Sequence, residues 1–173
     1  RDHPHAPLWL DVPVRTSQEA ADHLGVAVGQ IAKSVIFKRK SDDRAVLVIT
    51  SGDRRVDEKK VAALTGALGR ADADFVKAKT GFSIGGVAPL AHSETPVTLI
   101  DRELLRFDVV WAAAGHPNGV FALAPSQLEA LTGGAPLVVL DGVNKYFGDL
   151  HVLRDIDLTI HRLRRDIGRV SSI

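Results

Sequence analysis

The stretch from Thr80 to Leu90 constrains the fold of this chain more than any other, because it holds three glycines and a proline. Gly85 and Gly86 are adjacent and are followed by Val87-Ala88-Pro89, a pattern with little use inside a helix or a central strand. The backbone at two adjacent glycines bends sharply or comes close to another group. Because no β-carbon stands in the way, the two amides can hold a phosphate or a developing oxyanion. The alternative is a tight turn with no further function.

Composition excludes several kinds of chemistry. The 173 residues, of which 45% are hydrophobic and 25% charged, suit one globular domain with an appendage. The absence of cysteine removes disulfides, thiolate nucleophiles and cysteine-ligated zinc, and it fits the cytoplasmic location that we expect. No apolar run is long enough to span a membrane, so no membrane partner is expected. The net charge of +1 gives no overall electrostatic footprint for nucleic acid, although a partner with few phosphates near the protein stays compatible.

Capping signals predict short helices. Thr16-Ser17-Gln18-Glu19 is a capping box and predicts a helix that ends at Gly25. Asp57 is expected to cap a second helix that extends as far as Leu68. Residues 75–79 and the segment that begins at Pro125 predict two more short helices, each stopped by glycine.

Strand signals outnumber these helices. Residues 34–37 and 45–50 are β-branched and apolar, and the charged stretch between them predicts a hairpin or two neighbouring strands. Further strands are expected at residues 97–101, 109–113, 120–123 and 137–140. This pattern predicts an α+β fold with a mixed, mostly antiparallel, partly barrel-like sheet.

Lys33 lies near the start of an apolar segment, Ile31-Ala32-Lys33-Ser34-Val35-Ile36-Phe37. A lysine at such a position often lays its stem along apolar surface so that its ammonium reaches solvent. Alternatively, the side chain points into a cleft, where the ammonium meets an anionic or carbonyl oxygen. These residues alone leave both interpretations open.

Several of these features occur in one order and spacing that resembles a known family. They are Lys33, the strand pair, the segment 51–57 with its following helix, and the glycine motif with Gly81, Gly85, Gly86 and Pro89. Together they resemble the YbaK-like aminoacyl-tRNA deacylases, a family that includes the editing domain of bacterial prolyl-tRNA synthetases. The resemblance runs from about Thr16 to Leu140 and continues in Ile100-Asp101, in Ala114-Gly115-His116 and in residues 123–133.

The resemblance implies the YbaK/prolyl-tRNA synthetase editing-domain fold and a trans-editing hydrolase. Its substrate would be the ester of a mischarged aminoacyl-tRNA that carries a small amino acid, on tRNA-Pro or a similar tRNA. Lys33 is then the key functional side chain, with Gly85 and Gly86 as backbone donors. The implied partners are the 3′ end of the tRNA and a prolyl-tRNA synthetase, with no metal or organic cofactor. The alternative is a non-catalytic module that holds a tRNA end or a nucleotide-like ligand.

The resemblance also suggests which residues surround the substrate. Two of them have structural alternatives: a loop histidine such as His116 is often simply exposed, and Asp101 can cap the turn that follows its strand. The sequence shows no Ser-His-Asp motif and no obvious general base. We therefore expect a ribose hydroxyl of the substrate and a bound water to take part in the hydrolysis. The expected substrate-binding set is Ser34, Phe82, Val87, Pro89, Asp101, Gly115 and His116.

The last part of the chain differs in character. Residues 139–160 resemble the opening hairpin of an ABC-transporter ATPase subunit, in which an aromatic residue at the position of Tyr146 stacks on adenine. The phosphate-binding loop of that family is expected shortly after Ile160, but residues 161–173 do not contain it. We therefore expect an editing domain in residues 1–140, an atypical tail in residues 141–173, and no ATP binding.

Overall fold

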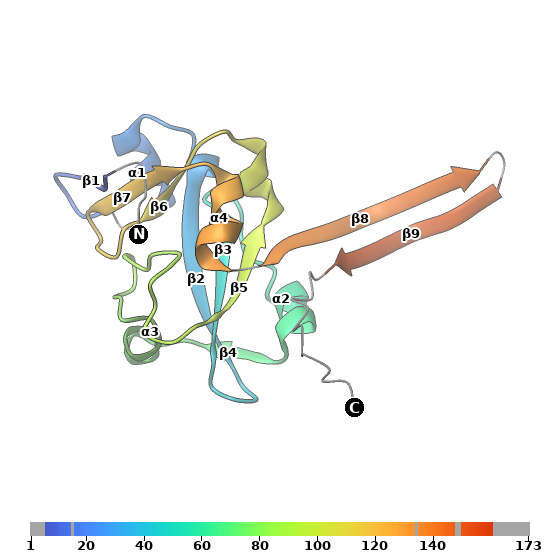
Figure 1. Cartoon of the computed structure of the whole chain (residues 1–173), viewed down its shortest axis with the longest axis horizontal. Coiled ribbons are helices and arrows are strands. Elements are labelled where there is room, and N and C mark those ends of the chain that lie inside the picture. Colours follow the sequence, from blue (N-terminus) through green and yellow to red (C-terminus); the bar gives the residue numbers. More distant parts are fainter. Residues whose placement is uncertain (1–5, 15, 134, 148–149, 161–173) are drawn as a thin grey trace, which may run out of the picture. The chain divides into compact units, whose positions relative to one another are not determined.

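The computed structural model describes residues 6–14, 16–133, 135–147 and 150–160. The chain divides into two units, Arg1–Ala135 and Pro136–Ile173. The first unit contains a sheet and four α-helices, and the second is built on a hairpin (Figure 1). None of the helices in these described ranges is long and apolar enough to cross a membrane.

The sheet of the first unit has the strand order β1-β7-β6-β2-β3-β5, and β4 also pairs with β2. Four of its pairings are antiparallel (β1–β7, β6–β7, β2–β3 and β2–β4), and two are parallel (β2–β6 and β3–β5). The predicted α+β fold with a mixed, mostly antiparallel sheet is therefore confirmed. The strands are β1 (Leu8–Trp9), β2 (Ile31–Arg39), β3 (Ala45–Ser51), β4 (Leu68–Arg70), β5 (Val97–Asp101), β6 (Val110–Ala113) and β7 (Gly119–Leu123).

The helices begin and end where the capping residues predict. Thr16 Oγ1 accepts a hydrogen bond from the Glu19 amide at 3.1 Å, and Gly25 ends the first helix in the left-handed conformation. The prediction that the second helix reaches Leu68 is wrong, because that helix ends before Gly66, which has a φ of 96°. The helices are α1 (Ser17–Leu24), α2 (Glu58–Thr65), α3 (Ala73–Thr80) and α4 (Pro125–Thr132), with 3-10 helices η1 (Val28–Gln30) and η2 (Arg102–Arg106).

The strand β3 forms the centre of the hydrophobic core, because every one of its residues is buried. Its side chains alternate between the two faces of the sheet. Leu47 and Ile49 belong to the cluster that contains Leu128 of α4, whereas Val46 and Val48 belong to the cluster that contains Val61 of α2. Both faces of β3 are therefore covered, whereas the middle residues of the neighbouring strand β2 are only partly buried.

The second unit contains an antiparallel hairpin of β8 (Ala135–Phe147) and β9 (Leu150–Ile160). A hairpin in this part of the chain agrees with the prediction for the tail. The resemblance to an ABC-transporter ATPase and the domain boundary after Leu140 stay predictions. Residues 148–149 and 161–173 of the predicted tail lie outside the described residues.

Candidate active site

A gap in the strand pairing of β2 creates the site. One side of β2 pairs with β3 from Ala32 to Lys38. On its other side, β6 pairs only at Ile31 and Ala32, and β4 pairs only from Phe37 to Arg39. Between these two short pairings, no described strand covers the edge at residues 33–36. In Figure 1, α1, β1, β6 and β7 surround one end of β2, while α3 and β4 lie near its other end. Lys33 and Ser34 therefore stand at an open sheet edge.

A cavity of about 270 Å³ lies at this open edge. Its walls come from the start of β2, from α1, from β6, from the glycine-rich turn and from the loop between β6 and β7. Most of the lining is apolar, and the few polar side chains converge on it, as is usual for small-molecule sites. The lining residues are Val14, Thr16, Ser17, Ala20, Ile31, Ala32, Lys33, Ser34, Ile84, Gly85, Val87, Trp111, Ala112, Ala113, His116, Pro117, Gly119 and Val120.

The glycine-rich segment forms a tight turn in which the two adjacent glycines have different tasks. The Gly86 amide donates to the Ser83 carbonyl at 3.0 Å, so it is not available as a ligand donor, contrary to expectation. Gly85 has a φ of 91°, which favours glycine, and it lines the cavity. Among the residues that the structure describes, nothing accepts a hydrogen bond from the Gly85 amide. Of the two backbone amides predicted to donate to a ligand, the Gly85 amide is thus the one that has no acceptor among the described residues.

Gly86 instead permits close contact between the two loops of the site. A β-carbon at this position would lie 2.9 Å from the carbonyl carbon of His116, closer than real contacts allow. A β-carbon at Gly115 would likewise lie 2.8 Å from the Phe82 ring. Phe82, Gly86 and Gly115 do not line the cavity, but they bring the turn that holds Gly85 against the loop that holds His116.

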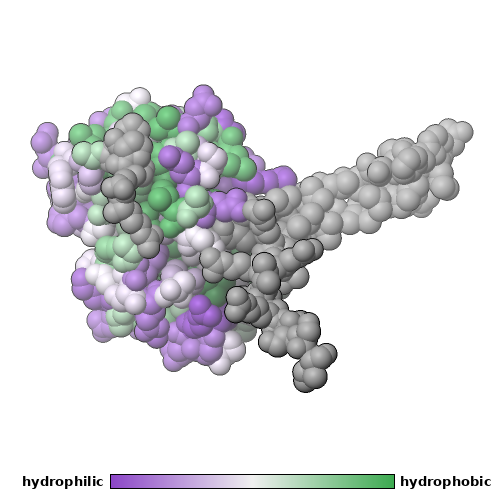
Figure 2. Space-filling model, in the orientation of Figure 1, coloured by the Kyte–Doolittle hydropathy of each residue, from purple (hydrophilic) through white to green (hydrophobic). Residues whose placement is uncertain are grey.

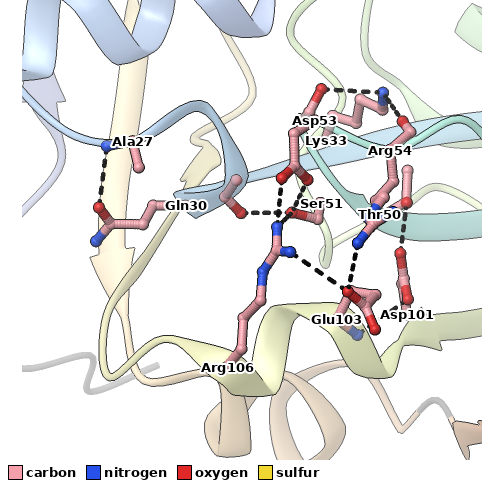
Figure 3. Close-up of polar contacts among 12 residues, drawn as sticks. Ala27, Gln30, Lys33, Thr50, Ser51, Asp53, Arg54, Asp101, Glu103 and Arg106 are labelled. Atoms are coloured by element: carbon pink, nitrogen blue, oxygen red, sulfur yellow. Dashed lines mark hydrogen bonds and ion pairs between the residues drawn. The ribbon is translucent and has the colours of Figure 1, made fainter.

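The Lys33 ammonium lies against backbone oxygens of the loop that follows β3. Its Nζ donates to the carbonyl of Arg54 at 2.5 Å and to that of Gly52 at 3.4 Å (Figure 3). Burial lowers the pKa of Lys33, and the nearby Arg55 lowers it further, whereas Asp53 and Asp101 raise it. The ammonium therefore meets carbonyl oxygens of the protein itself, and its contact with a ligand in the cleft stays a prediction.

A network of ion pairs fixes the loop that holds Lys33. Figure 3 shows Arg106 of η2 reaching Asp53, while Arg54 reaches Glu103. The distances are 2.5 Å from Arg106 to Asp53, 3.1 Å from Arg54 to Glu103 and 3.3 Å from Arg106 to Glu103. The pKa of Asp53 lies below its usual range because its carboxylate accepts a hydrogen bond from Ser51, which has the largest effect, and another from Arg106. The network therefore positions the carbonyls that bind Lys33.

Sequence reasoning missed the contribution of η2 to this network. Arg106 and Glu103 are separated from the loop at residues 51–54 by about fifty positions of sequence. No short motif links them, and the only local signal is the Ser51-Gly52-Asp53 turn after a predicted strand.

His116 lines the cavity in a defined hydrogen-bonding state. Its Nδ1 accepts from the Asn118 amide at 3.1 Å, and its ring meets Trp9 edge-on, with the ring centres 5.4 Å apart. Because Nδ1 is the acceptor, the proton of the neutral ring lies on Nε2, which is then a donor. His116 thus lines the cavity although it is exposed to solvent, and its contact with a substrate stays a prediction.

Besides Phe82 and Gly115, two more of the expected substrate-binding residues have structural roles outside the cavity. Asp101 accepts from the Thr50 hydroxyl at 2.8 Å and from the Glu103 amide at 3.0 Å, so it caps η2. Pro89 is fully buried. Val87, by contrast, lines the cavity, and its contact with a substrate stays a prediction. Within the described ranges, no cluster of three or more histidine or carboxylate side chains has the arrangement of a metal site.

The Ser34 hydroxyl is buried without a hydrogen-bond partner among the described residues. Ser51 provides a matched contrast, because its hydroxyl is hydrogen-bonded to Gly29, Asp53 and Arg106. A buried hydroxyl without a hydrogen-bond partner lowers the free energy of unfolding by about 1–3 kcal/mol. Removing a hydroxyl that is hydrogen-bonded has a similar cost, because its partners are then left without a hydrogen bond. We therefore expect Ser34→Ala to raise the free energy of unfolding by about 1 kcal/mol and Ser51→Ala to lower it by about 1–3 kcal/mol.

Urea unfolding of the two serine variants measures both changes. A loss of stability in Ser34→Ala equal to that in Ser51→Ala would mean that the Ser34 hydroxyl is satisfied in the folded protein. A gain of stability together with a higher KM would indicate a polar group kept unpaired for a ligand.

Known proteins share the fold and much of the sequence. Residues 11–131 match the family model described as the aminoacyl-tRNA editing domain. The uncharacterized protein YwhH of Bacillus subtilis is 35% identical over 115 residues, which are 66% of this chain and 73% of that protein. A solved structure, described as a proposed trans-editing enzyme for prolyl tRNA synthetase, superposes with a TM-score of 0.71 at 39% identity. That match covers 75% of this chain and 82% of the other.

A second group of relatives consists of much longer proteins. The proline–tRNA ligase of a Thermoanaerobacter species is 30% identical over 95 residues, which are 53% of this chain. The chain spans only 16% of the length of that ligase.

Proposed function

The chain belongs to the aminoacyl-tRNA editing domain family, and from this premise we propose that it hydrolyses the ester of mischarged aminoacyl-tRNA in trans. The observation that carries the proposal is the cavity at the open edge of β2. It brings together the side chain of Lys33, the Gly85 amide and the Nε2 donor of His116. The Gly85 amide has no hydrogen-bond acceptor among the described residues. These are the groups that ester hydrolysis needs to hold a carbonyl and stabilise an oxyanion.

Gly85 and Lys33 would share the stabilisation of negative charge. The Gly85 amide donates to the ester oxygen on which charge develops. Lys33 uses two of its three N–H donors on the carbonyls of Gly52 and Arg54. Its third donor and its positive charge remain for the substrate, either at the terminal phosphate or at the ester oxygens. Ser34, with its unpaired hydroxyl, can bind a polar group of the aminoacyl moiety.

The base in this reaction would come from the substrate. Lys33 and His116 are the only ionisable side chains among the residues that line the described cavity. The remaining ring nitrogen of His116, Nε2, carries a proton, so this tautomer donates and does not accept. A free ribose hydroxyl beside the ester can instead orient the attacking water and relay its proton: it accepts the proton of the water while it gives its own proton to the ribose oxygen that leaves the ester.

The dimensions of the cavity favour a small substrate group. Pockets that enclose drug-sized ligands measure about 300–1,000 Å³, and this cavity of about 270 Å³ lies below that range. A small amino acid joined to a ribose suits it, on tRNA-Pro or a similar tRNA. The likeness to ligases suggests that a prolyl-tRNA synthetase supplies the mischarged product, which would place the protein in the cytoplasm with the translation machinery.

A panel of charged tRNAs tests this function. Wild-type protein is incubated with tRNAs that carry alanine, cysteine, serine or proline, and the remaining ester is followed with time. We expect hydrolysis of at least one small aminoacyl ester. Selectivity within the panel should be modest, because one methylene changes binding by only about 1–3 kcal/mol. Binding of a charged tRNA without hydrolysis of any ester would favour the non-catalytic module instead.

A further inference from the structure

We propose that Trp9 forms a stacking platform for the terminal nucleobase of the aminoacyl-tRNA, at the mouth of the cavity; the assignment rests on the proposed function. Trp9 lies in β1, before the segment of residues 11–131 that matches the family. Its side chain is 62% exposed, a large fraction for an indole. Aromatic side chains that stack on bases are the recurring means of holding single-stranded nucleic acid.

Trp9 is fixed beside the cavity. The Leu10 amide donates to the Asn118 carbonyl at 2.8 Å, and the Asn118 side-chain amide donates to the Leu10 carbonyl at 3.2 Å. The Trp9 ring meets the ring of His116, and it lies so near Gly119 that a β-carbon there would be 3.4 Å from the indole. Both His116 and Gly119 line the cavity. The indole is therefore a rigid neighbour of the site even though most of it faces solvent.

The surroundings of Trp9 are suited to an apolar ring. Figure 2 shows apolar residues gathered over the upper centre of the unit, near β2, whereas polar residues predominate near α3 and β4. Ile84 lines the cavity and is nevertheless 61% exposed. Exposed apolar groups around a pocket commonly mark a binding surface.

The volume of the cavity leaves the base outside it. A cavity of about 270 Å³ lies below the usual range for drug-sized ligands, so it suits a small aminoacyl group and its ribose better than a whole aminoacyl-nucleoside. The terminal adenine is attached directly to that ribose, so it must lie at the rim of the cavity. Among the residues that the structure describes, Trp9 is the large aromatic side chain exposed beside this rim, so it is the group best placed to stack on the base.

Steady-state deacylation by wild type, Trp9→Ala and Trp9→Phe tests the platform. Loss of one stacked base costs about 1–3 kcal/mol, so Trp9→Ala should raise KM by roughly 10- to 100-fold. Its kcat should change far less than its KM, because the indole does not touch the ester. Trp9→Phe should restore most of the affinity, since phenylalanine also stacks. A tRNA whose terminal nucleotide lacks its base should be insensitive to Trp9→Ala.

An unchanged KM in Trp9→Ala, or an equal rise on the abasic substrate, would overturn the platform while leaving the hydrolase intact. Sedimentation of the same variants identifies the other possible occupant. If wild type is a dimer and Trp9→Ala a monomer with unchanged KM, a second copy of the chain covers Trp9 and the platform is wrong.

Fluorescence provides a readout that does not depend on hydrolysis. Adenosine 5′-monophosphate should quench the emission of wild type, and the quenching should be reduced in Trp9→Phe, which retains Trp111. If wild type hydrolyses no ester but shows this quenching, the proposed function fails and the platform stands. If quenching is the same in both proteins, the platform fails whatever the activity.

Discussion

Replacing Lys33 by methionine is expected to lower kcat/KM for deacylation by about 100- to 1,000-fold, the usual cost of removing one preorganised charge donor from an active site. Methionine keeps the apolar stem that lines the cavity and removes the ammonium. The carbonyls of Gly52 and Arg54 lose their donor, so a modest loss of stability should accompany the change. Thermal unfolding monitored alongside the kinetics separates the two effects.

Lys38 provides the control for this substitution. It lies on the same strand, where it pairs with Asp43 at 3.0 Å away from the cavity. An exposed ion pair of this kind contributes little, so Lys38→Met should retain the wild-type rate. Equal rates in Lys33→Met and wild type would remove Lys33 from the mechanism.

The pH dependence of the Lys33 effect has a defined sign. Burial lowers the pKa of Lys33 below that of an ordinary lysine. The charged form is the active one in this mechanism, and it is lost as the pH rises through the lowered pKa. The ratio of the wild-type rate to the Lys33→Met rate should therefore fall on the alkaline side, at a lower pH than for an unperturbed lysine. The rate of spontaneous alkaline hydrolysis, measured without protein, is subtracted from both rates before the ratio is taken.

A tRNA whose terminal adenosine carries hydrogen in place of the 2′-hydroxyl should bind but not turn over. Proton transfer by a positioned group contributes about 100- to 10,000-fold to a rate, and within the described cavity the protein offers no side chain to replace it. We expect the deoxy substrate to act as a competitive inhibitor, with an inhibition constant close to the KM of the normal substrate. Single-turnover kinetics with the substrate charged at its 3′-oxygen measure the loss directly.

The matched control for this experiment is a tRNA with the same deletion at the penultimate nucleotide, which should be hydrolysed normally. Hydrolysis of the terminal deoxy substrate at the normal rate would rule out assistance by the substrate. The search for a base would then return to His116 and to its alternative tautomer.

Much of the fold could be predicted because its signals are local. Thr16 and Asp57 cap helices through their own side chains, and Gly25 ends a helix through its own φ. The two shortest strands escaped prediction for the opposite reason. Leu8–Trp9 and Leu68–Arg70 are too short for any periodicity, and they are strands only because β7 and β2 pair with them.

The features of the candidate site also divide into those that could be predicted from the sequence and those that could not. The turn at Gly85 and the lysine at the start of a strand could be identified from residues close together in sequence. The support of the Lys33 loop by Arg106 could not, since it depends on how distant segments meet. The engagement of the Gly86 amide could not either, since it depends on which local turn forms. A glycine pair predicts freedom of the backbone, but which amide stays free is decided by the turn that forms.

The most direct test of the central claim is the rate at which wild-type protein alone, without a synthetase, removes a small amino acid from mischarged tRNA. The measurement compares loss of the ester in the presence of protein with its spontaneous loss in buffer, and uses correctly charged tRNA as the reference. We predict that the protein accelerates hydrolysis of the mischarged ester, and that the acceleration requires Lys33. Loss of the ester at the spontaneous rate for every member of the panel would contradict the assignment of this cavity as an editing site.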